Sequence, residues 1–452
     1  MIIYSIIQKS QLEGAHRLDA EYYQPEFLEA FRKIKDIKTV NIGDFCRVAD
    51  GDHSKIPGFV EADGARYLRA KDLQYFFIDD SDPVYVSKPY FEKLKRSHIK
   101  PLDIVLSIMG TVGNLAIVLP ESPIMTANRA VCIISPKNQD LYNSYFLAVY
   151  LESAYGVVQR ERESMGGVQE RVNLDDLEKI RIPLFSKSQQ QVIVNIFQEA
   201  LSNNFNSKLL YQQAENLLLE ELGLRDFQTE EDLSFVVNFS DVQNADRIDA
   251  EYFQPKYKNL ESRIMNYGSK RLGDLVSMKK GFEPGSEAYQ EEGRLFIRVS
   301  SVSKFGIDNK DQKYLSNDLY QKLKNNFQLQ LGEILLTKDA TPGIAYVIKE
   351  SIEGIISGGI LRLKLKENID SEYLALCISS LIGQMQAERD SGGSVIVHWK
   401  PEQIKKLLIP ILPKDPQREI GDLVRKSHEA RKKSKELLEE AKRKVEDIIE
   451  NG

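Results

Sequence analysis

The stretch 16–27, HRLDAEYYQPEF, decides the fold, because the chain repeats it 230 residues later at 246–257 as DRIDAEYFQPKY. The offset persists beyond this motif, since 42–44 (IGD) recurs at 272–274 (LGD). Matches of this density at one offset indicate an internal duplication. The sequence therefore predicts two copies of one structural unit, arranged in tandem.

Each copy begins with short segments typical of strands and ends with one long helix. Residues 361–365 (LRLKL) alternate apolar and charged side chains, as a half-buried strand does. Residues 188–222 and 416–449 carry apolar residues at steps of three and four, which predicts amphipathic helices. Both helices become small or polar at their centres. We interpret this as a register-setting device for paired helices, with two separate core helices as the alternative.

The expected fold class is α+β: a tandem repeat of two strand-rich globular domains, each followed by a long helix. The two helices are expected to pair as an antiparallel coiled coil, each spanning roughly 50 Å. The linker is polar and begins with a glycine, which is a helix-stop signal. The expected boundaries are 1–183 (first domain), 184–222 (first helix), 223–232 (linker), 233–412 (second domain) and 413–452 (second helix).

Composition favours a globular, membrane-free protein. Of the residues 42% are hydrophobic and 28% are charged, and no apolar run approaches the roughly 18–20 residues of a spanning helix. The start, MIIYSII, lacks a basic leader and a cleavage site, so we expect no signal peptide. Cys46, Cys132 and Cys377 are far apart and are expected to be small buried hydrophobic residues in a reducing compartment. The expected location is therefore the cytoplasm.

Motifs for catalysis are absent from the sequence. There is no phosphate-binding glycine loop, no His-Glu-x-x-His, no Cys-x-x-Cys and no Gly-x-Ser-x-Gly. The Asn/Asp-Pro-Pro-aromatic motif of adenine methyltransferases is also missing. We therefore expect no catalytic and no metal-ligating residues, and interpret the chain as a recognition scaffold. A DNA-modifying enzyme and a two-headed adaptor for proteins are the alternatives left open.

A duplicated scaffold with divergent loops suits a target with two half-sites, and duplex DNA is the natural candidate. The net charge of −6 is low for a protein that wraps DNA alone, so we expect local contacts or help from a partner. The expected contacts are polar or basic residues on glycine-flanked loops. In the first copy these are His53, Ser54, Lys55, Arg69, Lys71, Asn128, Arg129, Gln169 and Arg171. In the second they are Lys279, Lys280, Arg298, Ser300, Lys338, Ser394, His398 and Lys400.

The repeated motif itself contains charged residues that we assign differently. Arg17 and Asp19 in the first copy are matched by Arg247 and Asp249 in the second. Because they belong to the shared framework, we interpret them as intramolecular ion pairs or caps and not as DNA contacts.

The order of these features resembles the specificity subunit of type I restriction-modification systems. The resemblance rests on the doubled Arg-[Leu/Ile]-Asp-Ala-Glu-Tyr-[Tyr/Phe]-Gln-Pro and on 103–114 (DIVLSIMGTVGN), which is followed by 128–130 (NRA). It also rests on the Gly-Gly pair and the Ile-Pro that precede each long helix. The resemblance covers nearly the whole chain.

The resemblance implies two target-recognition domains, each reading one half of a bipartite site in duplex DNA, with the helices setting the gap. It implies no catalysis and no cofactor in this chain. Two methyltransferase subunits would supply S-adenosylmethionine, and restriction-translocase subunits would use Mg and ATP. The second copy departs from the first at 338–340 (KDA in place of IMG) and lacks the Asn128–Arg129 pair. A specificity module of another DNA-modification system is the alternative.

Overall fold

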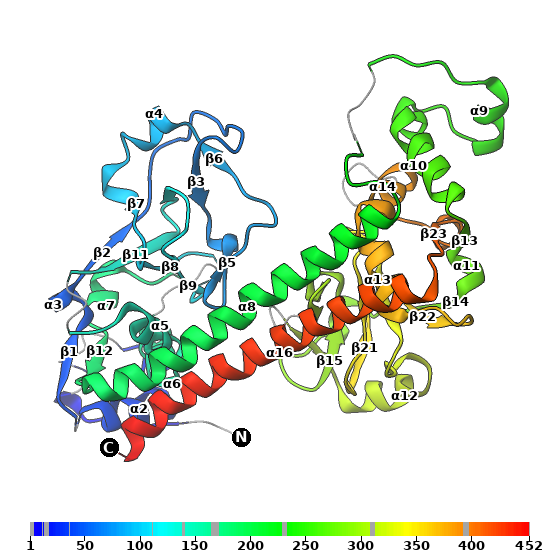
Figure 1. Ribbon diagram of the computed structural model, residues 1–452. Helices are drawn as coiled ribbons and strands as arrows, with labels where there is room; N and C mark the ends of the chain where they lie inside the picture. The colour runs from blue at the N-terminus through cyan, green and yellow to red at the C-terminus, as the bar shows by residue number, and fades with distance from the viewer. Residues whose placement is uncertain are drawn as a thin grey trace. The chain divides into compact units, whose positions relative to one another are not determined.

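The computed structural model describes residues 4–10, 12, 18–35, 37–110, 112–137, 141–163, 171–227, 233–307, 312–391 and 397–451. Packing divides the chain into two compact units (Figure 1). Unit 1 comprises residues 1–202 and 433–452, and unit 2 comprises residues 203–432. Within the described ranges, no helix is long and apolar enough to cross a membrane.

Unit 1 is built on two four-stranded sheets, with strand orders β2-β11-β8-β9 and β6-β3-β10-β7. Short pairs β1-β12 and β4-β5 complete its strands among the described residues. Its elements are η1 (Ala20–Tyr23), α2 (Pro25–Lys35), β1 (Thr39–Asn41), α3 (Ile42–Phe45), β2 (Cys46–Asp50), β3 (Ala65–Leu68), η2 (Ala70–Asp72), β4 (Leu73–Gln74), β5 (Phe77–Ile78), β6 (Tyr85–Val86), α4 (Lys88–Phe91), η3 (Lys95–Ser97), β7 (His98–Ile99), β8 (Ile104–Ser107), β9 (Leu115–Ile117), β10 (Met125–Ala127), β11 (Val131–Pro136), α5 (Ser144–Glu152), α6 (Ala154–Glu163), α7 (Leu174–Glu178), β12 (Arg181–Pro183) and the first half of α8 (Lys187–Glu221).

Unit 2 repeats this plan with sheets ordered β14-β22-β19-β20 and β18-β15-β21 and with pairs β13-β23 and β16-β17. The second half of α8 and the first half of α16 belong to it. Its further elements are α9 (Phe239–Ala245), η4 (Ala250–Phe253), α10 (Pro255–Asn266), β13 (Ser269–Arg271), α11 (Leu272–Leu275), β14 (Val276–Lys280), η5 (Ser286–Ala288), β15 (Arg294–Ile297), η6 (Val299–Ser301), β16 (Val302–Ser303), β17 (Gly306–Ile307), β18 (Lys313–Leu315), α12 (Asn317–Phe327), β19 (Ile334–Thr337), β20 (Ala345–Val347), β21 (Gly354–Ile356), β22 (Ile360–Leu365), α13 (Ser371–Ser379), α14 (Leu381–Asp390), α15 (Pro401–Ile404), β23 (Leu408–Pro410) and α16 (Lys414–Asn451).

The sheet β14-β22-β19-β20 matches β2-β11-β8-β9, and β18-β15-β21 matches β6-β3-β10, so the predicted α+β repeat is confirmed. In place of β7, the described part of unit 2 has a single bridge between Gln328 and Ile355. In both units one pair is parallel, β3 with β10 and β15 with β21, while the other pairs of the two larger sheets are antiparallel. The alternation predicted at 361–365 is present in β22, where Leu361 and Leu363 are buried and the charged residues between and after them are not. Strand burial on one face thus follows from the period-two pattern.

The long helices α8 and α16 pack against each other inside each unit (Figure 1). In unit 2, Ser427 Oγ donates to the carbonyl of Ser207 at 2.7 Å, and Arg431 donates to Asn204 Oδ1 at 2.7 Å. From Asn204 to Ser207 the residue number on α8 rises, while that of the contacting residue on α16 falls from Arg431 to Ser427. The helices therefore run antiparallel, as predicted. In unit 1, Ser434 Oγ donates to the carbonyl of Ala200 at 2.7 Å. At the small and polar centre seen in the sequence, the helices are therefore joined by hydrogen bonds from side chains to backbone carbonyls and, at Arg431 and Asn204, between side chains.

The repeated motif forms a short 3-10 turn followed by a helix in both copies, η1 with α2 and η4 with α10. A proline begins each helix, where its missing N–H is not needed. In the second copy Arg247 pairs with Asp249 at 2.5 Å, which confirms the predicted ion pair and lowers the pKa of Asp249. Arg17 of the first copy lies outside the described residues. The three cysteines are buried and unpaired, as predicted.

Candidate nucleic-acid interface

Several strands of unit 1 end at the same side of its sheets. The last residue of β2, Asp50, pairs with Cys132 near the start of β11, and the last residue of β8, Ser107, pairs with Val131. The parallel strands β3 and β10 end there too, with Leu68 opposite Ala127. We call this region rim 1. It consists of residues 50–55, 69–71, 107–110, 128–131 and 171.

Backbone hydrogen bonds tie the loops of rim 1 together. Asp52 N–H donates to the carbonyl of Ala127 at 2.7 Å, and Asn128 N–H donates to the carbonyl of Leu68 at 3.0 Å. Gly51 allows this close approach, because a Cβ atom there would lie 2.2 Å from the carbonyl oxygen of Asn128. The loops are therefore held by the main chain, and their side chains are left for other roles.

A separate backbone contact brings a distant segment to rim 1. Ile108 N–H donates to the carbonyl of Ala130 at 2.8 Å, and Val172 N–H donates to the carbonyl of Ile108 at 3.1 Å. Arg171 forms an isolated antiparallel bridge with Met109. Ile108 and Met109, the two residues that directly follow β8, thus lie between the segment 128–130 and Arg171. The sequence had proposed DNA contacts in both places separately.

Two acidic residues organise the first loop of rim 1. Asp52 accepts from Tyr90 Oη at 2.7 Å and from Ser54 N–H at 2.9 Å. Burial alone would raise the pKa of Asp52, but these hydrogen bonds outweigh it and lower the pKa. His53 Nε2 lies 2.5 Å from Asp50 Oδ2, so His53 and Ser54 are both positioned by neighbouring carboxylates.

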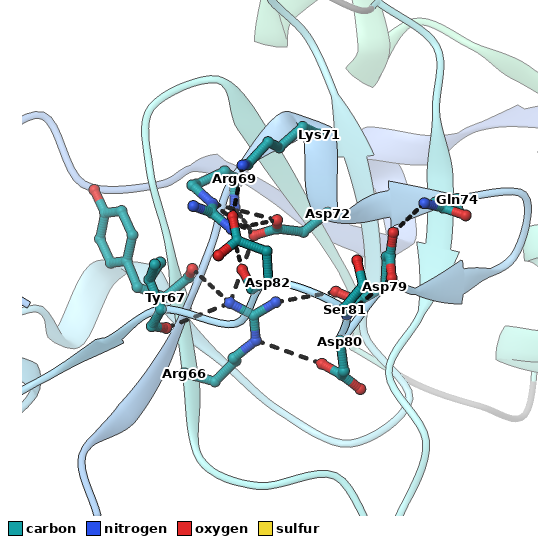
Figure 2. Close-up of polar contacts among 11 residues, drawn as sticks. Arg66, Tyr67, Arg69, Lys71, Asp72, Gln74, Asp79, Asp80, Ser81 and Asp82 are labelled. Atoms are coloured by element: carbon teal, nitrogen blue, oxygen red, sulfur yellow. Dashed lines mark hydrogen bonds and ion pairs between the residues drawn. The ribbon is translucent and has the colours of Figure 1, made fainter. Parts of the chain in front are cut away.

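Arg69 and Lys71 lie in a network of internal ion pairs (Figure 2). Arg69 Nη2 lies 2.9 Å from Asp72 Oδ1 and 3.3 Å from Asp82 Oδ2, and Lys71 Nζ lies 2.8 Å from the same Asp82 oxygen. The hydrogen bond with Asp72 raises the pKa of Arg69. These two cations already have carboxylate partners, so they are placed as framework residues of rim 1, and any DNA contact by them stays a prediction.

Sequence reasoning missed Arg66, which lies beneath this network. Its guanidinium is 1% exposed and donates to the carbonyls of Tyr67, Val84 and Asp79 at 3.1–3.3 Å (Figure 2). Its Nε also lies 3.5 Å from Asp80. The sequence did contain a clue: an arginine lies within the strand Ala65–Leu68, and the acidic segment 79–82 follows it. A buried arginine needs such hydrogen-bonding or acidic partners.

Lys55 and Arg129 are the cations of rim 1 that face solvent without an internal partner. Both are exposed, and neither makes a hydrogen bond or ion pair with any residue of the described ranges. Arg171 is also exposed, and its guanidinium donates to Asn173 Oδ1 at 3.0 Å. Asn128 uses its side-chain oxygen to accept from Ala130 N–H at 3.1 Å, which shapes the turn that carries Arg129. Gln169 lies outside the described residues.

Unit 2 builds the same framework from different residues. We call the region rim 2; it consists of residues 280–283, 298–300, 337–340, 357–360 and 398–400. Phe282 N–H donates to the carbonyl of Ile356 at 2.9 Å, and Ser357 N–H donates to the carbonyl of Ile297 at 2.8 Å. A Cβ atom on Gly281 would lie 2.2 Å from the carbonyl oxygen of Ser357. Each of these contacts has its counterpart in rim 1.

The counterparts in the two rims carry different side chains. Asn128 and Arg129 of rim 1 correspond to Ser357 and Gly358 of rim 2, because Asp52 bridges Asn128 as Phe282 bridges Ser357. The sequence departure noted at this pair is therefore a real difference in the groups presented at one position. The other sequence difference between the copies, at 338–340, lies directly after β19, where Asp339 forms a bridge with His398.

Rim 2 contains a chain of three polar groups. Lys338 Nζ lies 2.5 Å from Asp339 Oδ2, and Asp339 Oδ1 lies 2.7 Å from His398 Nδ1. Burial alone would raise the pKa of Asp339, but hydrogen bonds from Lys338 and His398 outweigh it and lower the pKa. Trp399 N–H donates to the carbonyl of Lys338 at 2.8 Å, as Val172 does to Ile108 in rim 1.

The other residues expected to contact DNA in unit 2 are divided between the rim and its surroundings. Lys280, Ser300 and Lys400 are exposed at rim 2. Arg298 directly precedes η6, as Arg69 directly precedes η2. Lys279 lies one residue before the rim, with its ammonium 5.4 Å from the ring centre of Phe327. Ser394 lies outside the described residues, and its role stays a prediction, as do the DNA contacts of the others.

A domain family, a characterised relative and several solved structures are similar to the chain. A family model for the type I restriction modification DNA specificity domain matches residues 34–215 and again 265–442. The specificity subunit of the type I restriction enzyme EcoBI from Escherichia coli is 30% identical over 138 residues. This match covers 30% of the chain and 29% of that relative, so the chain aligns with less than a third of its length.

Solved structures of specificity subunits align over most of the chain at low identity. The S subunit of a type I restriction-modification system from M. genitalium is 14% identical, with a TM-score of 0.41, over 91% of this chain and 96% of that one. The HsdS subunit from Thermoanaerobacter tengcongensis is 14% identical, with a TM-score of 0.30, over 92% and 96%. Since the family model covers well over half of the sequence in two copies, the chain belongs to the family of type I restriction modification DNA specificity domains.

Proposed function

We propose that this chain is the DNA-recognition subunit of a type I restriction-modification complex. Rim 1 would read one half of a bipartite site in duplex DNA, and rim 2 would read the other half. One observation carries the proposal: the two rims share their backbone hydrogen bonds but present different side chains. A framework that is kept while its side chains change is what two readers of unlike half-sites require, because base identity is read by side chains.

The free cations of each rim support this assignment. Lys55 and Arg129 in rim 1 and Lys280 in rim 2 are exposed and lack hydrogen-bond or ion-pair partners within the described ranges. Such groups suit phosphate oxygens, and a guanidinium also matches the O6 and N7 acceptors of guanine. The chain as a whole carries a charge of −6, so we expect partner subunits to contact much of the DNA backbone.

Methylation and cleavage would come from partner subunits, and this chain would be non-catalytic. We propose two methyltransferase subunits with S-adenosylmethionine, joined for restriction by translocase subunits that use Mg and ATP. The repeat supports a partner present in two copies. Leu18 and Ile248 occupy the same place in the duplicated motif, and they are 85% and 90% exposed. Exposed apolar side chains at these matched positions would suit one contact that is made twice, once by each copy.

Base-resolution mapping of methylated adenines in the source genome tests the proposal. Deleting the gene should remove methylation at one split motif, because the methyltransferase then lacks its specificity subunit. Arg129→Ala should relax one half of the motif and Lys280→Ala should weaken only the other half, each by about 5- to 150-fold at the affected position. Lys208→Ala, an exposed lysine on α8, is the matched control and should leave both halves intact. An unchanged methylome after deletion would contradict the proposal.

A further inference from the structure

In each rim, one residue comes from a segment far along the chain and is held there by an isolated β-bridge. Arg171 bridges Met109 in rim 1, and His398 bridges Asp339 in rim 2. The flanking hydrogen bonds agree: Val172 N–H donates to Ile108 at 3.1 Å in one unit, and Trp399 N–H donates to Lys338 at 2.8 Å in the other. Arg171 and His398 are therefore structurally equivalent, and both are exposed at their rims.

The chemistry around the equivalent positions is different. The main chain opposite Arg171 carries the apolar pair Ile108 and Met109, and the guanidinium is bound at one end by Asn173 Oδ1 at 3.0 Å. An arginine held in this way keeps further N–H groups for acceptors outside the protein. Among the four bases, guanine presents a pair of acceptors in the major groove, O6 and N7.

In rim 2 the imidazole of His398 is fixed by a charged pair. Asp339 accepts from His398 at Nδ1 and from Lys338 at Nζ, each with a different carboxylate oxygen. The side chain of Lys338 is 11% exposed and that of Asp339 is 21% exposed, while that of His398 is 59% exposed. Gly359 lets the neighbouring segments pack closely, because a Cβ atom there would lie 2.6 Å from Val299 Cγ2 and 3.3 Å from Asp339 Oδ2. The pair is thus a shielded support, and the ring is the group presented outward.

This support determines which ring nitrogen is available. A carboxylate oxygen only accepts hydrogen bonds, so the neutral ring donates its Nδ1–H to Asp339. Nε2 then carries the lone pair and accepts a hydrogen bond. In the major groove, the hydrogen-bond donors that Nε2 of His398 can accept from are the exocyclic amino groups, N4 of cytosine and N6 of adenine.

We propose that the bridge position, Arg171 in unit 1 and His398 in unit 2, determines one base pair of each half-site. Arg171 contacts guanine, and His398, positioned by Asp339 and Lys338, contacts the amino group of cytosine or adenine. The inference rests on the proposed function, because it assigns a base contact within the rims. It goes further in naming the residue pair that makes the two half-sites differ and the base group that each one recognises.

The test maps methylated adenines in the source organism with variants in the chromosomal gene. His398→Ala should relax one position of one half-site, with the preference there falling by about 10-fold and the other half unchanged. The triple variant Lys338→Ile, Asp339→Met and His398→Arg places the residues of the rim 1 bridge in rim 2 and leaves no shielded lysine without its carboxylate. It should create a preference for guanine at that same position. The reciprocal Ile108→Lys, Met109→Asp and Arg171→His should change the other half-site only. Lys208→Ala is the control for an unrelated surface change.

Each outcome separates the inference from the proposed function. If gene deletion removes the wild-type motif but His398→Ala and the triple variant leave it unchanged, the bridge position reads nothing and the inference is overturned. If His398→Ala and His398→Gln both abolish methylation while the chain remains folded by circular dichroism, His398 is needed for more than one base pair and the inference also fails. If the wild-type gene directs no motif, it is the proposed function that fails.

Discussion

The tips of two matching hairpins show how differently the units fasten a strand pair to the long helices. In unit 1 the β4–β5 hairpin turns at Tyr75 and Phe76, both in the left-handed region with φ of 27° and 70°. In unit 2 the β16–β17 hairpin turns at Lys304 and Phe305, and a glycine, Gly306, takes the positive φ of 137°. Left-handed backbone at a non-glycine residue costs about 1–3 kcal/mol, so only unit 1 stores strain here.

The two tips also make different contacts. Phe76 is fully buried and packs edge-on against Phe197 of α8, with ring centres 5.1 Å apart. Phe305 is half-buried and packs edge-on against Tyr211, also at 5.1 Å, with the Lys304 ammonium 4.5 Å above that ring. The same joint is therefore built in unit 1 from a fully buried ring at a strained turn, and in unit 2 from a half-buried ring at an unstrained turn. Both tips add a polar contact to a long helix: Tyr75 Oη donates to Glu439 of α16, and the Lys304 ammonium lies over Tyr211 of α8. The comparison shows that duplication preserved the attachment and not the means of making it.

Truncating the two phenylalanines should separate the two joints most strongly. Phe76→Ala removes a fully buried ring and leaves alanine in the strained conformation, so we expect a loss of about 4 kcal/mol in the free energy of unfolding of unit 1. Phe305→Ala removes a half-buried ring and should cost about 2 kcal/mol in unit 2. Hydrogen exchange measured by mass spectrometry on peptides of each unit reports the two losses separately.

The matched control exchanges the aromatic residue without emptying the site. Phe76→Leu keeps an apolar side chain and should retain more than half of the stability lost in Phe76→Ala. Equal losses for Phe76→Ala and Phe305→Ala would show that burial at the tip does not distinguish the joints, and would break the comparison.

The duplication and the helix pair could be predicted because each is written in local or periodic sequence patterns. The match between 16–27 and 246–257 predicted the repeat. Apolar residues spaced three and four apart predicted the helices α8 and α16. Arg247 and Asp249 are only two residues apart in the repeated motif, so their ion pair could be predicted from the local sequence. The rim loops were found for a related reason: glycines such as Gly51 and Gly281 mark where one backbone must approach another.

The partners of the rim side chains could not be predicted, because tertiary pairing decides them. Arg69 and Lys71 share Asp82 only because the β4–β5 hairpin returns the chain to their side. His398 reaches Asp339 across 59 residues, through a bridge that has no sequence signature. A pattern shows which groups are available. Long-range contacts decide whether a cation is already paired, like Arg69, or has no partner among the described residues, like Arg129.

The joint of unit 2 contains a buried histidine. His428 of α16 lies with Nε2 3.0 Å from the carbonyl oxygen of Lys304 and with Nδ1 in hydrogen-bond contact with Lys349 Nζ. Glu372 lies 3.8 Å from the ring, and the rings of Tyr211 and Tyr346 face it. Burial first, and then the charge of Lys349, lower the pKa of His428 to about 4.

Acid should therefore weaken unit 2 through His428. Between about pH 6.5 and pH 4 the unfolded chain binds a proton that the folded chain does not, so the stabilisation is present above pH 6.5 and is lost as the pH falls. A depression from 6.5 to about 4 corresponds to a loss of about 3 kcal/mol by pH 4. The sole tryptophan, Trp399, is buried in unit 2, so denaturant titrations followed by its fluorescence measure this unit.

His428→Gln isolates this effect from that of Glu372. Burial raises the pKa of Glu372, so that group binds its proton earlier in the folded state and opposes the loss. The difference in unfolding free energy between wild type and His428→Gln should therefore be read at each pH. It should shrink or reverse from pH 7.5 to pH 4.5, since glutamine has no proton to accept. A difference that stays constant over this range would mean that the joint is not sensitive to acid through His428.

The smallest difference between the units concerns a serine that caps the same helix in both. Ser316 Oγ accepts from Leu319 N–H at 3.2 Å at the start of α12, which has 11 residues. Ser87 Oγ accepts from Tyr90 N–H at 3.4 Å at the start of α4, which has only 4 residues. Ser316→Ala should cost unit 2 about 1 kcal/mol, and Ser87→Ala should cost unit 1 less than that, because the longer bond caps a single turn.

Fluorescence of Trp399 measures the first loss, and hydrogen exchange at 88–94 measures the second. Ser316→Thr and Ser87→Thr retain a capping hydroxyl and should restore most of each loss. Tyr90 also donates to Asp52, so its position does not depend on Ser87 alone, which is a further reason for the smaller effect. A larger loss in Ser87→Ala than in Ser316→Ala would show that rim 1 depends on this cap to hold Tyr90 against Asp52, and would make the cap part of the recognition loop.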